Sequence, residues 1–509
     1  MSLNKFGTNK KFLAAVVAVG MIFTLTTAVG PAQAAKTTLV VGSVQAYPQL
    51  NPIIRTFAYE ENLFSLLWAG LTQWKPDGTV GPNLAKSWSA NKTADKWTFV
   101  LRSGAKFSDG TPITSQSVKE VFDYALLEKT PSQEKSKIKT ITKVTASGNN
   151  VIFDLSSPSA VFPSAIPNIV IIKVSEIANF NKNPSTSGPF MVKSFSPDVS
   201  LTIVPNPKYF GIKPKLTEIK FVKSADPTAA VTSLRSGDID VMYNLPLADA
   251  APLAKDKKLQ ILRAKVPSGS VDWEFDMTSA PFNNLKVRQA LAYATDRATM
   301  LKIAYYGFGK VTTFNTAVPQ KSIWQCGTAG GLIEYPYDLK KAKALFAEAG
   351  VTKFSWWGIA GGYPEFSAMA QILQASLKEI GITMDIQNNE VGTWAAKFYP
   401  AGKTYPGLVL PNLLNFADEP AFSMGFLLSG RAESNWNNAA YDAAYKEAVG
   451  TLDLKERKAA WCKAQKLENQ QIPYIIPFSI DFLHGGRADV RGVWVEGGGQ
   501  PHFEGAYIR

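Results

Sequence analysis

Apolar residues in this chain recur with two different periods. In Lys96–Arg102, Trp97, Phe99 and Leu101 occupy every second position, which predicts a strand with one buried face. In Thr114–Leu126, apolar residues are spaced by three and four, which predicts a capped helix. Strand-like and helix-like segments alternate in this way to the C-terminus, so we predict an α/β protein with mixed sheets.

The clearest α/β succession lies in the second half of the chain. Asp338 is predicted to cap a helix that ends at Gly350. A strand at Phe354–Gly358, a helix at Ala368–Ile380 and a strand at Thr383–Ile386 follow. We predict a β-α-β unit here, with a right-handed crossover.

The stretch Phe275–Arg297 lies just past the middle of the chain. It begins extended, passes through a Pro-Phe-Asn-Asn loop and becomes helical. The predicted helix has an apolar stripe at Val287, Ala290, Leu291, Ala294 and Ala298. We interpret the stretch as the passage from one globular lobe to another, with a ligand between the lobes. Arg288 and Arg297 are expected on the solvated side or in structural pairs.

The first 34 residues have the pattern of a signal peptide. Lys5, Lys10 and Lys11 form a basic region, an uncharged apolar run follows, and Ala32-Gln33-Ala34 is suited to cleavage. Retention as an anchor is the alternative. No cysteine is near this junction, so we do not expect a lipoprotein. We predict export to the periplasm or the cell envelope.

Charge and composition narrow the class of protein. The 509 residues are 46% hydrophobic and 19% charged, as in a folded protein of two or three domains. The net charge is +13, and it falls to +10 without the leader, which carries three lysines and no acid. The charge is spread along the chain, so nucleic-acid binding is not expected.

The only cysteines are Cys326, in a Gly-rich loop, and Cys462, on a predicted helix. In an oxidising compartment we predict a disulfide between them, and two buried thiols are the alternative.

Signatures of catalysis are few. His484 and His502 are the only histidines, and no cysteine or carboxylate set at metal-ligand spacing accompanies them, so we expect no metal site. We find no nucleophile elbow and no phosphate loop. Asp418 and Glu419 form an adjacent acidic pair that could serve a hydrolase, although such pairs are usually solvated loops. We predict a binding protein without a cofactor rather than an enzyme.

Several separated motifs appear in a fixed order along the chain. The longest is WTFVLRSGAKFSDGTPIT at Trp97–Thr114, and the others are SGPF at Ser187–Phe190, NPKYF at Asn206–Phe210, SGDID at Ser236–Asp240 and VRQALAYA at Val287–Ala294. As an ordered set they resemble the peptide/nickel-binding family of ABC-transporter solute-binding proteins. The matches span essentially the whole chain after the leader.

This resemblance implies a two-lobed periplasmic-binding-protein fold, with two crossing strands and an extra domain inserted in lobe I. The lobes would close on a ligand by hinge bending and dock on permease subunits of the transporter. The first crossing strand is expected at Phe275–Met277 and the second at Pro477–Ser479. The implied segments are 1–34 for the signal peptide, 35–80 for lobe I, 81–185 for the extra domain, 186–275 for lobe I again, 276–473 for lobe II and 474–509 for the last part of lobe I.

The chain departs from the dipeptide-binding members in the two segments that hold a zwitterion there. The segment expected to supply an arginine, Trp356–Tyr363, has no basic residue. The segment expected to supply an aspartate, Leu413–Pro420, has Phe416 at the anchor position, with Asp418 as a substitute. Two C-terminal histidines argue against nickel or haem.

Aromatic and amide side chains remain as candidate ligand contacts, each with core packing as an equally good interpretation. They are Tyr47, Trp273, Trp356, Trp357, Trp394, Asn415 and Phe416, together with Asp418. We therefore predict an import receptor for an oligopeptide, acting as a monomer. The alternatives are an oligosaccharide or another neutral solute in the same role, or a secreted hydrolase that uses Asp418 and Glu419.

Overall fold

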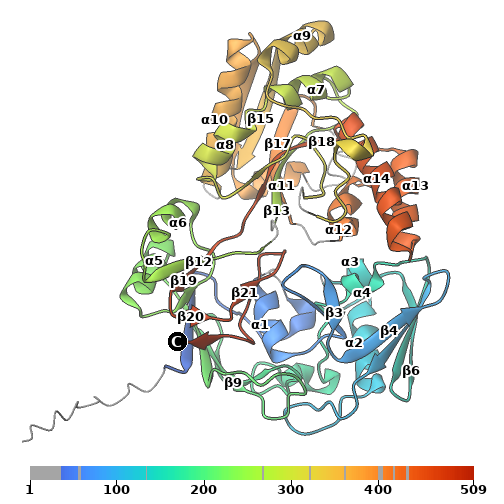
Figure 1. Ribbon diagram of the computed structural model, residues 1–509, viewed down its shortest axis with the longest axis vertical. Helices are drawn as coiled ribbons and strands as arrows, with labels where there is room; N and C mark the ends of the chain where they lie inside the picture. Colours follow the sequence, from blue (N-terminus) through green and yellow to red (C-terminus); the bar gives the residue numbers. More distant parts are fainter. Residues whose placement is uncertain are drawn as a thin grey trace, which may run out of the picture. The chain divides into compact units, whose positions relative to one another are not determined.

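Three sheets of four or more strands organise the part of the chain that the computed structural model describes (Figure 1). The described residues are 36–55, 59–132, 134–265, 269–319, 322–359, 363–398, 405–415, 419–431 and 435–509. We call the regions built on the seven-, four- and six-stranded sheets lobe I, the extra domain and lobe II.

Lobe I contains segments from both ends of the chain. Its sheet has the order β12 (Leu259–Leu262), β19 (His484–Arg487), β11 (Val241–Met242), β1 (Thr38–Ser43), β10 (Glu218–Lys223), β9 (Ser200–Pro205) and β8 (Phe190–Ser196). β1 runs parallel to β10 and β11, and the other pairs are antiparallel. The accompanying helices are η1 (Pro52–Ile54), α1 (Glu60–Leu67), α5 (Pro227–Ser236) and α6 (Leu247–Leu253).

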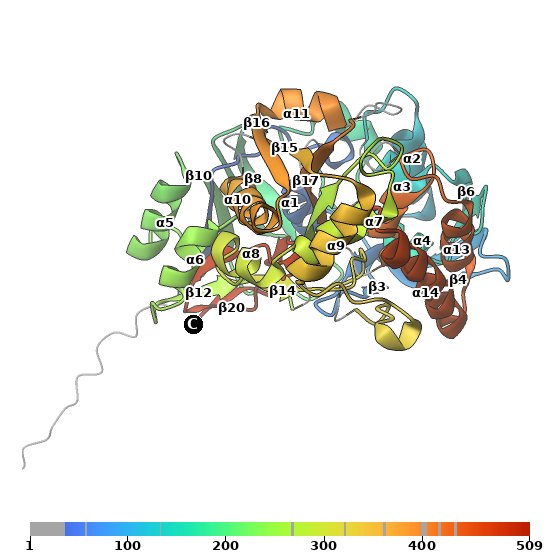
Figure 2. The same ribbon diagram turned by 90° about the horizontal axis from the view of Figure 1, so that it is seen from above.

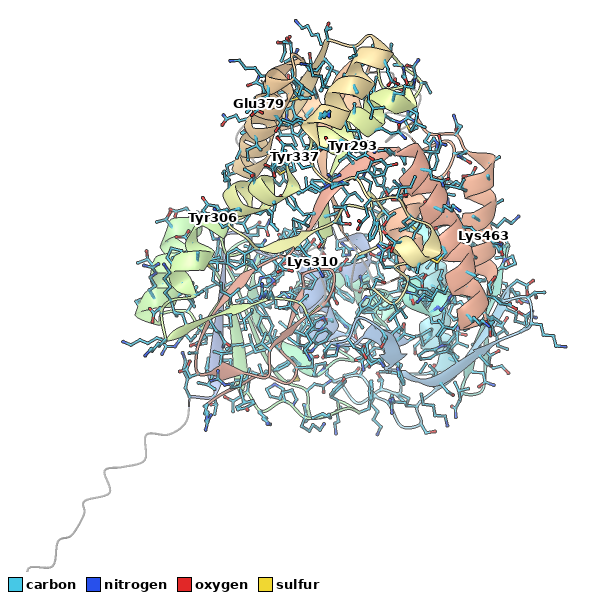
Figure 3. All side chains as sticks on the ribbon, turned by 45° about the horizontal axis from the view of Figure 1, so that its top comes forward. Tyr293, Tyr306, Lys310, Tyr337, Glu379 and Lys463 are labelled. Atoms are coloured by element: carbon cyan, nitrogen blue, oxygen red, sulfur yellow. A yellow bond between two sulfur atoms is a disulfide. The ribbon has the colours of Figure 1, made fainter. Side chains whose placement is uncertain are left out.

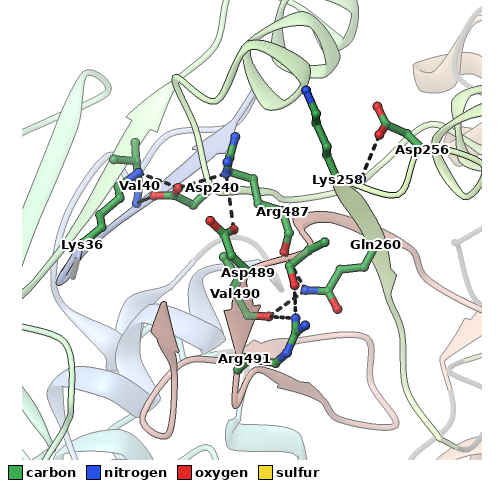
Figure 4. A network of polar contacts seen from close by, with 11 residues as sticks. Lys36, Val40, Asp240, Asp256, Lys258, Gln260, Arg487, Asp489, Val490 and Arg491 are labelled. Carbon is green, nitrogen blue, oxygen red and sulfur yellow. Dashed lines mark hydrogen bonds and ion pairs between the residues drawn. The ribbon is translucent and has the colours of Figure 1, made fainter. Parts of the chain in front are cut away.

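Polar contacts anchor the returning C-terminal segment to lobe I (Figure 4). The buried carboxylate of Asp240 accepts hydrogen bonds from Lys36 Nζ at 2.6 Å and from the Val40 amide at 2.8 Å. The Gln260 amide donates to the carbonyls of Arg487 and Val490, each at 2.7 Å. Two small ribbons complete the tail: β20 (Val490–Arg491) with β23 (Tyr507–Ile508), and β21 (Trp494–Val495) with β22 (Pro501–His502).

The extra domain is an antiparallel sheet covered by a short helical layer. Its strands have the order β4 (Ala85–Ala90), β5 (Lys96–Leu101), β7 (Asn150–Leu155) and β6 (Ile141–Ser147). Its other elements are β2 (Thr72–Trp74), β3 (Val80–Pro82), α2 (Ser115–Leu126), α3 (Lys135–Ile138), α4 (Phe162–Ala165) and η2 (Val174–Asn179). The inward alternation predicted for β5 is confirmed, because Trp97, Phe99 and Leu101 are buried.

Lobe I and the extra domain share one continuous hydrophobic core. Leu39 and Val41 of β1 belong to the same buried cluster as Phe99, Phe122 and Phe153 of the extra domain. A shared apolar core makes independent movement of these two regions costly, because separating them would expose that surface to water. They therefore form one wall of the molecule.

Lobe II is built on a mixed sheet flanked by helices. The strands have the order β14 (Gly309–Val311), β18 (Tyr474–Ile480), β13 (Gly269–Glu274), β17 (Leu408–Asn415), β15 (Lys353–Ile359) and β16 (Thr383–Asn389). Figure 2 shows α11 (Val391–Phe398) at one side of β15 and α9 (Leu339–Ala349) at the other. The remaining helices are α7 (Leu285–Ala294), α8 (Arg297–Ala304), η3 (Thr328–Gly330), α10 (Pro364–Glu379), α12 (Pro420–Met424), η4 (Gly425–Leu427), α13 (Ala439–Gly450) and α14 (Leu454–Gln471).

The β-α-β unit predicted in lobe II is present. β15 and β16 are parallel neighbours, and α10 connects them. The Asp338 carboxylate caps α9 by accepting from the Lys341 amide at 2.9 Å. Gly350 ends α9 with a φ of +66°, a conformation that glycine adopts without a Cβ clash.

The apolar stripe from Val287 to Ala298, which predicts one helix, spans two helices in the structure, α7 and α8. Thr295 is extended, and the Asp296 carboxylate caps a new helix by accepting from the Thr299 amide at 3.0 Å. Arg297 fills the corner between α7 and α8. Its guanidinium donates to the Ala292 and Tyr335 carbonyls at 2.9 Å and 2.8 Å.

Arg288 and Arg297 are both 3% exposed, so the expectation of solvated positions is wrong. Arg288 donates to the Phe282 and Gln471 carbonyls, at 2.6 Å and 2.9 Å. Burial lowers the pKa of Arg288 to about 10 and that of Arg297 to about 9. Both arginines thus join backbone segments from inside lobe II.

The crossing between the lobes lies earlier in the chain than predicted. β13 already pairs with β18 in the lobe II sheet, where Gly269 is opposite Ile480. β12 and β19 pair in lobe I, where Leu262 is opposite His484. The connections are therefore residues 263–268 and 481–483, and the predicted strands at 275–277 and 477–479 are wrong as crossing points. Arg263 and Asp481 form an ion pair of 3.0 Å across these connections.

The predicted partners Cys326 and Cys462 are joined in the structure. Their Cα atoms are 5.7 Å apart, and 136 residues separate them in sequence. The bond ties the loop around η3 to α14, next to a buried cluster that contains Trp324 and Trp461.

We expect Cys326→Ala/Cys462→Ala to lower the free energy of unfolding by about 3–5 kcal/mol, because closing a loop of this length restricts the unfolded chain. Urea unfolding of the variant and of the parent protein measures the difference. Thiol counting on unfolded, unreduced protein should find no free thiol, and two free thiols would refute the bond.

Candidate functional site

A cavity of about 1410 Å³ separates lobe II from the other two regions. Its lobe II wall comes from α12, η4 and α13, and it includes Phe422 and Tyr445. The opposite wall comes from the segments around β3, α3 and α4 of the extra domain, and includes Trp74. Glu61 of α1 and the tail segment Glu496–Gln500 also line it. All three regions thus contribute to one site.

The two walls are in contact around Ala160 and Val161. The Ala160 amide of the extra domain donates to the Val449 carbonyl of α13 at 2.6 Å, and its carbonyl accepts from Arg457 at 3.3 Å. Val161 belongs to the buried cluster of α13 and α14, and the Lys137 ammonium lies 5.8 Å from the centre of the Phe422 ring.

An ion-pair network lies beside Glu61. Arg55 contacts the carboxylates of both Glu61 and Glu134, and Lys137 contacts Glu134 at 2.9 Å. Burial raises the pKa of Glu61 to about 7, and the Arg55 charge opposes this shift. Glu134, which lies between two cations, has a lowered pKa although burial acts against it.

The tail contributes a second paired acid. Glu496 Oε2 is 3.0 Å from His502 Nε2, and the His502 ring stacks on Trp494 with ring centres 3.8 Å apart. Burial disfavours the charged imidazole, but the carboxylates of Glu504 and Glu496 raise the pKa of His502 to about 10. His502 is therefore a cation at neutral pH, and Glu496 is compensated.

Two carboxyl groups of β13, Asp272 and Glu274, lie on one face of the strand because they are two residues apart. Both are buried, and Glu274 lines the cavity. Burial raises the pKa of Asp272 to about 7, while a hydrogen bond with Glu274 opposes the shift. Tyr474 of β18 lies opposite Glu274 in the sheet. The pair therefore holds a proton at mildly acidic pH.

Asp276, just beyond β13, is buried but richly hydrogen-bonded. Its carboxylate accepts from Ser279 Oγ at 2.6 Å, Thr278 Oγ1 at 2.7 Å and the Tyr405 amide at 3.2 Å. Asn435 Nδ2 donates at 3.2 Å. Burial acts against the charged form, but the hydroxyls of Ser279 and Thr278 lower the pKa of Asp276. Asp276 thus joins three segments of lobe II, those around Ser279, Tyr405 and Asn435.

The predicted tryptophan contacts lie in the core of lobe II. Trp273 and Trp356 are fully buried and pack edge to face, with ring centres 5.5 Å apart. Trp394 is 4% exposed in the same core, and Trp357 packs against it from the edge. The structure brings these four residues together, but none of them is on the lining of the cavity.

The other predicted contacts are scattered. Tyr47 is half-buried in lobe I, and its hydroxyl donates to Asn62 Oδ1 at 3.1 Å. Its pKa is raised well above the usual range, mainly by burial. Asn415 ends β17, and Phe416 and Asp418 lie outside the described residues. Glu419, the partner of Asp418 in the hydrolase alternative, accepts from Trp461 Nε1 at 3.2 Å.

Sequence reasoning missed the charged lining of the cavity. Glu61, Glu274, Lys137 and Glu496 come from segments far apart in the chain, and no spacing motif connects them. Glu274 had one usable signal in the sequence, since Asp272 and Glu274 are two positions apart and therefore lie on the same face of one strand. Within the described residues, no group of three or more His, Cys, Asp and Glu side chains could hold a metal ion, and no helix is long and apolar enough to span a membrane.

Comparison with known families gives one extended match. Residues 79–434 match the model described as bacterial extracellular solute-binding proteins, family 5 (middle). Among curated relatives, the chain is 26% identical over 483 residues to the "Probable D,D-dipeptide-binding periplasmic protein DdpA" of Escherichia coli (strain K12), covering 90% of this chain and 91% of the relative. It is 25% identical to the dipeptide-binding protein of the same organism, covering 92% and 94%.

Solved structures agree on the fold. The ABC transporter substrate-binding protein CtaP of Listeria monocytogenes superposes with a TM-score of 0.83 at 21% identity, and the match covers 93% of this chain and 99% of CtaP. At this identity the likeness shows the two-lobed architecture alone.

Asp272→Asn should make stability less sensitive to pH. Because the folded-state pKa of about 7 exceeds the unfolded value, the folded protein binds a proton that the unfolded chain has lost, so wild-type stability falls as pH rises to about 7. The slope is at most about 1.4 kcal/mol per pH unit. Urea unfolding at about pH 5 and about pH 8 should show a smaller loss in the variant. An equal loss would contradict the raised pKa.

Asp276→Asn is the matched control substitution, because the pKa of Asp276 is lowered whereas that of Asp272 is raised. A lowered pKa means that the charged Asp276 stabilises the folded state above the unfolded pKa, and this contribution is lost as pH falls through the folded pKa. We expect destabilisation by about 1.5–3 kcal/mol at neutral pH, the usual worth of hydrogen bonds to a charged group. The same urea titrations should show this difference shrink below about pH 4.

Proposed function

This chain belongs to the bacterial extracellular solute-binding proteins of family 5, and we propose that it captures an oligopeptide between its lobes and delivers it to the permease of an ABC importer. Membership makes it an exported binding protein. As part of the same proposal, the leader is cleaved after Ala34, and the mature protein acts as a monomer without a lipid anchor.

The observation that carries the proposal is the cavity between two walls that are joined by paired connections. A volume of about 1410 Å³ exceeds the range of about 300–1,000 Å³ that is typical of small-molecule sites, so it has room for a ligand longer than a dipeptide. The largest hydrophobic cores of the two walls are separate, and the smaller cluster of α13 and α14 includes Val161 of the extra domain, an arrangement that suits closure by bending.

The lining favours a peptide over a neutral sugar. The aromatic candidates Trp273 and Trp356 are fully buried, and the aromatic residues that do line the cavity, among them Trp74, Phe422 and Tyr445, lie beside charged groups. The cavity instead presents charged groups of both signs, including Glu61, Glu274 and Lys137. Peptides supply complementary charges at their termini and side chains, and buried charges need such partners when water is expelled.

The delivery step follows from closure. The connections 263–268 and 481–483 are short, so bending there would swing lobe II toward the extra domain as a unit. Closure would bring surfaces of both lobes into one arrangement that a permease could distinguish from the open form. A ligand that contacts both walls would stabilise that arrangement.

Titration calorimetry separates the ligand classes. We expect heat from a mixture of tri- to pentapeptides and none from cello- or chito-oligosaccharides. Small-angle scattering of the peptide-bound protein should show a smaller radius of gyration than the free protein, because the lobes close. If only the sugars give heat, the ligand is a sugar rather than a peptide. The absence of heat from both sets of compounds would count against both ligands.

The hydrolase alternative has its own test. Incubation of the purified protein with the same peptides and sugars should leave them intact, as judged by mass spectrometry. Hydrolytic turnover that is lost in Asp418→Asn would overturn the role as a binding protein.

A further inference from the structure

Several acids on the lining of the cavity are ion-paired within the protein. Glu61 is paired with Arg55, and Glu496 is paired with His502. Glu274 shares one face of β13 with Asp272, and burial raises the pKa of Asp272 to about 7.

The two remaining acids lie on α13. Glu447 pairs with Lys463 of α14 at 2.8 Å, and Lys463 is labelled in Figure 3. Asp442 accepts a hydrogen bond from the Ser429 amide at 3.0 Å. Within the part of the chain that the structure describes, none of the five acids forms an ion pair with Lys75, Lys139 or Lys446.

Three lysines on the same lining form no ion pair. Lys75 lies in the turn between β2 and β3, Lys139 lies between α3 and β6, and Lys446 lies on α13. Among the residues that the structure describes, none of the three has a carboxylate within ion-pair distance. Asp77, the acid nearest to Lys75 in sequence, accepts from the amide and hydroxyl of Thr79 at 3.0 Å and 2.6 Å, and these bonds lower its pKa more than the charge of Lys75 does.

We propose that Lys75, Lys139 and Lys446 form an anion subsite that selects peptides carrying acidic side chains. The proposal rests on the proposed peptide-binding function and names the class of peptide. The carboxylates of such a ligand supply the countercharge that the lining lacks, through charge-assisted hydrogen bonds to the ammonium groups. An anionic peptide therefore suits this cavity better than the neutral solute that is the alternative in the sequence analysis.

Because the three lysines lie on both walls of the cavity, the charge of the ligand would affect how readily the lobes close. Lys75 and Lys139 lie on the wall formed by lobe I and the extra domain, whereas Lys446 belongs to lobe II on the facing wall. In the open cavity each ammonium group is hydrated. Closure removes part of that water and brings like charges together, which is unfavourable without an anion between them. An acidic ligand removes this penalty by bridging the walls.

Three matched tripeptides test the subsite: Ala-Glu-Glu, Ala-Gln-Gln and Ala-Lys-Lys, titrated into the mature protein by calorimetry. We expect Ala-Glu-Glu to bind about tenfold or more tightly than Ala-Gln-Gln, and Ala-Lys-Lys to bind most weakly. The preference should shrink as salt is raised from about 0.02 M to about 1 M, because salt screens partly exposed charges.

The variant Lys139→Gln/Lys446→Gln should weaken Ala-Glu-Glu by about tenfold or more and change Ala-Gln-Gln by less than about twofold. Lys139→Arg/Lys446→Arg should retain the preference because it keeps both charges. The matched control is Lys143→Gln/Lys458→Gln, which removes the same net charge from exposed positions outside the lining. The control should bind all three peptides as the parent protein does.

Each outcome decides between the inference and the peptide function. Equal binding of Ala-Glu-Glu and Ala-Gln-Gln, or equal effects of the lysine and control variants, would overturn the anion subsite and leave a peptide receptor. If no peptide binds but trigalacturonate binds in a manner that Lys139→Gln/Lys446→Gln abolishes, the peptide function falls and the subsite stands. If neither acidic probe binds, the subsite is overturned.

Discussion

The arrangement of this protein depends on the antiparallel pairing of the two segments that connect its lobes. Each segment enters a sheet at both ends, so β12 and β19 are hydrogen-bonded in lobe I and β13 and β18 in lobe II. The two ladders end at Leu262 and His484 in lobe I and at Gly269 and Ile480 in lobe II. In the proposed closure, the bend would lie between these two ladders.

The buried carboxyl groups near the cavity differ in how their surroundings shift their pKa. Hydroxyl and amide donors lower the pKa of Asp276 although burial acts against the charged form, whereas burial raises the pKa of Asp272 to about 7. Glu61 is held by Arg55. Glu496 and Glu447 on the lining are also ion-paired, whereas Lys75, Lys139 and Lys446 form no ion pair in the part of the chain that the structure describes. The preference for an anionic ligand follows from this balance rather than from one residue.

Local structure was predictable wherever capping and periodicity agreed. Asp338 and Gly350 mark the ends of α9 in sequence and in the structure, and the alternation of β5 correctly identifies its buried face. The same reasoning failed at Thr295–Asp296, because the apolar stripe continues across a corner that the buried Arg297 stabilises through distant carbonyls. The crossing point was misplaced for a related reason, since strand pairing over two hundred residues decides which sheet β13 joins.

By itself, the sequence determined the α/β alternation, the leader pattern, the cysteine pair and the ordered motifs of the family, because these depend on residues close together or on their order. The tertiary structure alone decided which side chains face the cavity. A tryptophan has the same sequence signature in a core and on a ligand wall, and Trp273 and Trp356 are in the core. Lys75, Lys139 and Lys446 are ordinary surface lysines in sequence, and only the fold brings them to one cavity with several of its acids already ion-paired.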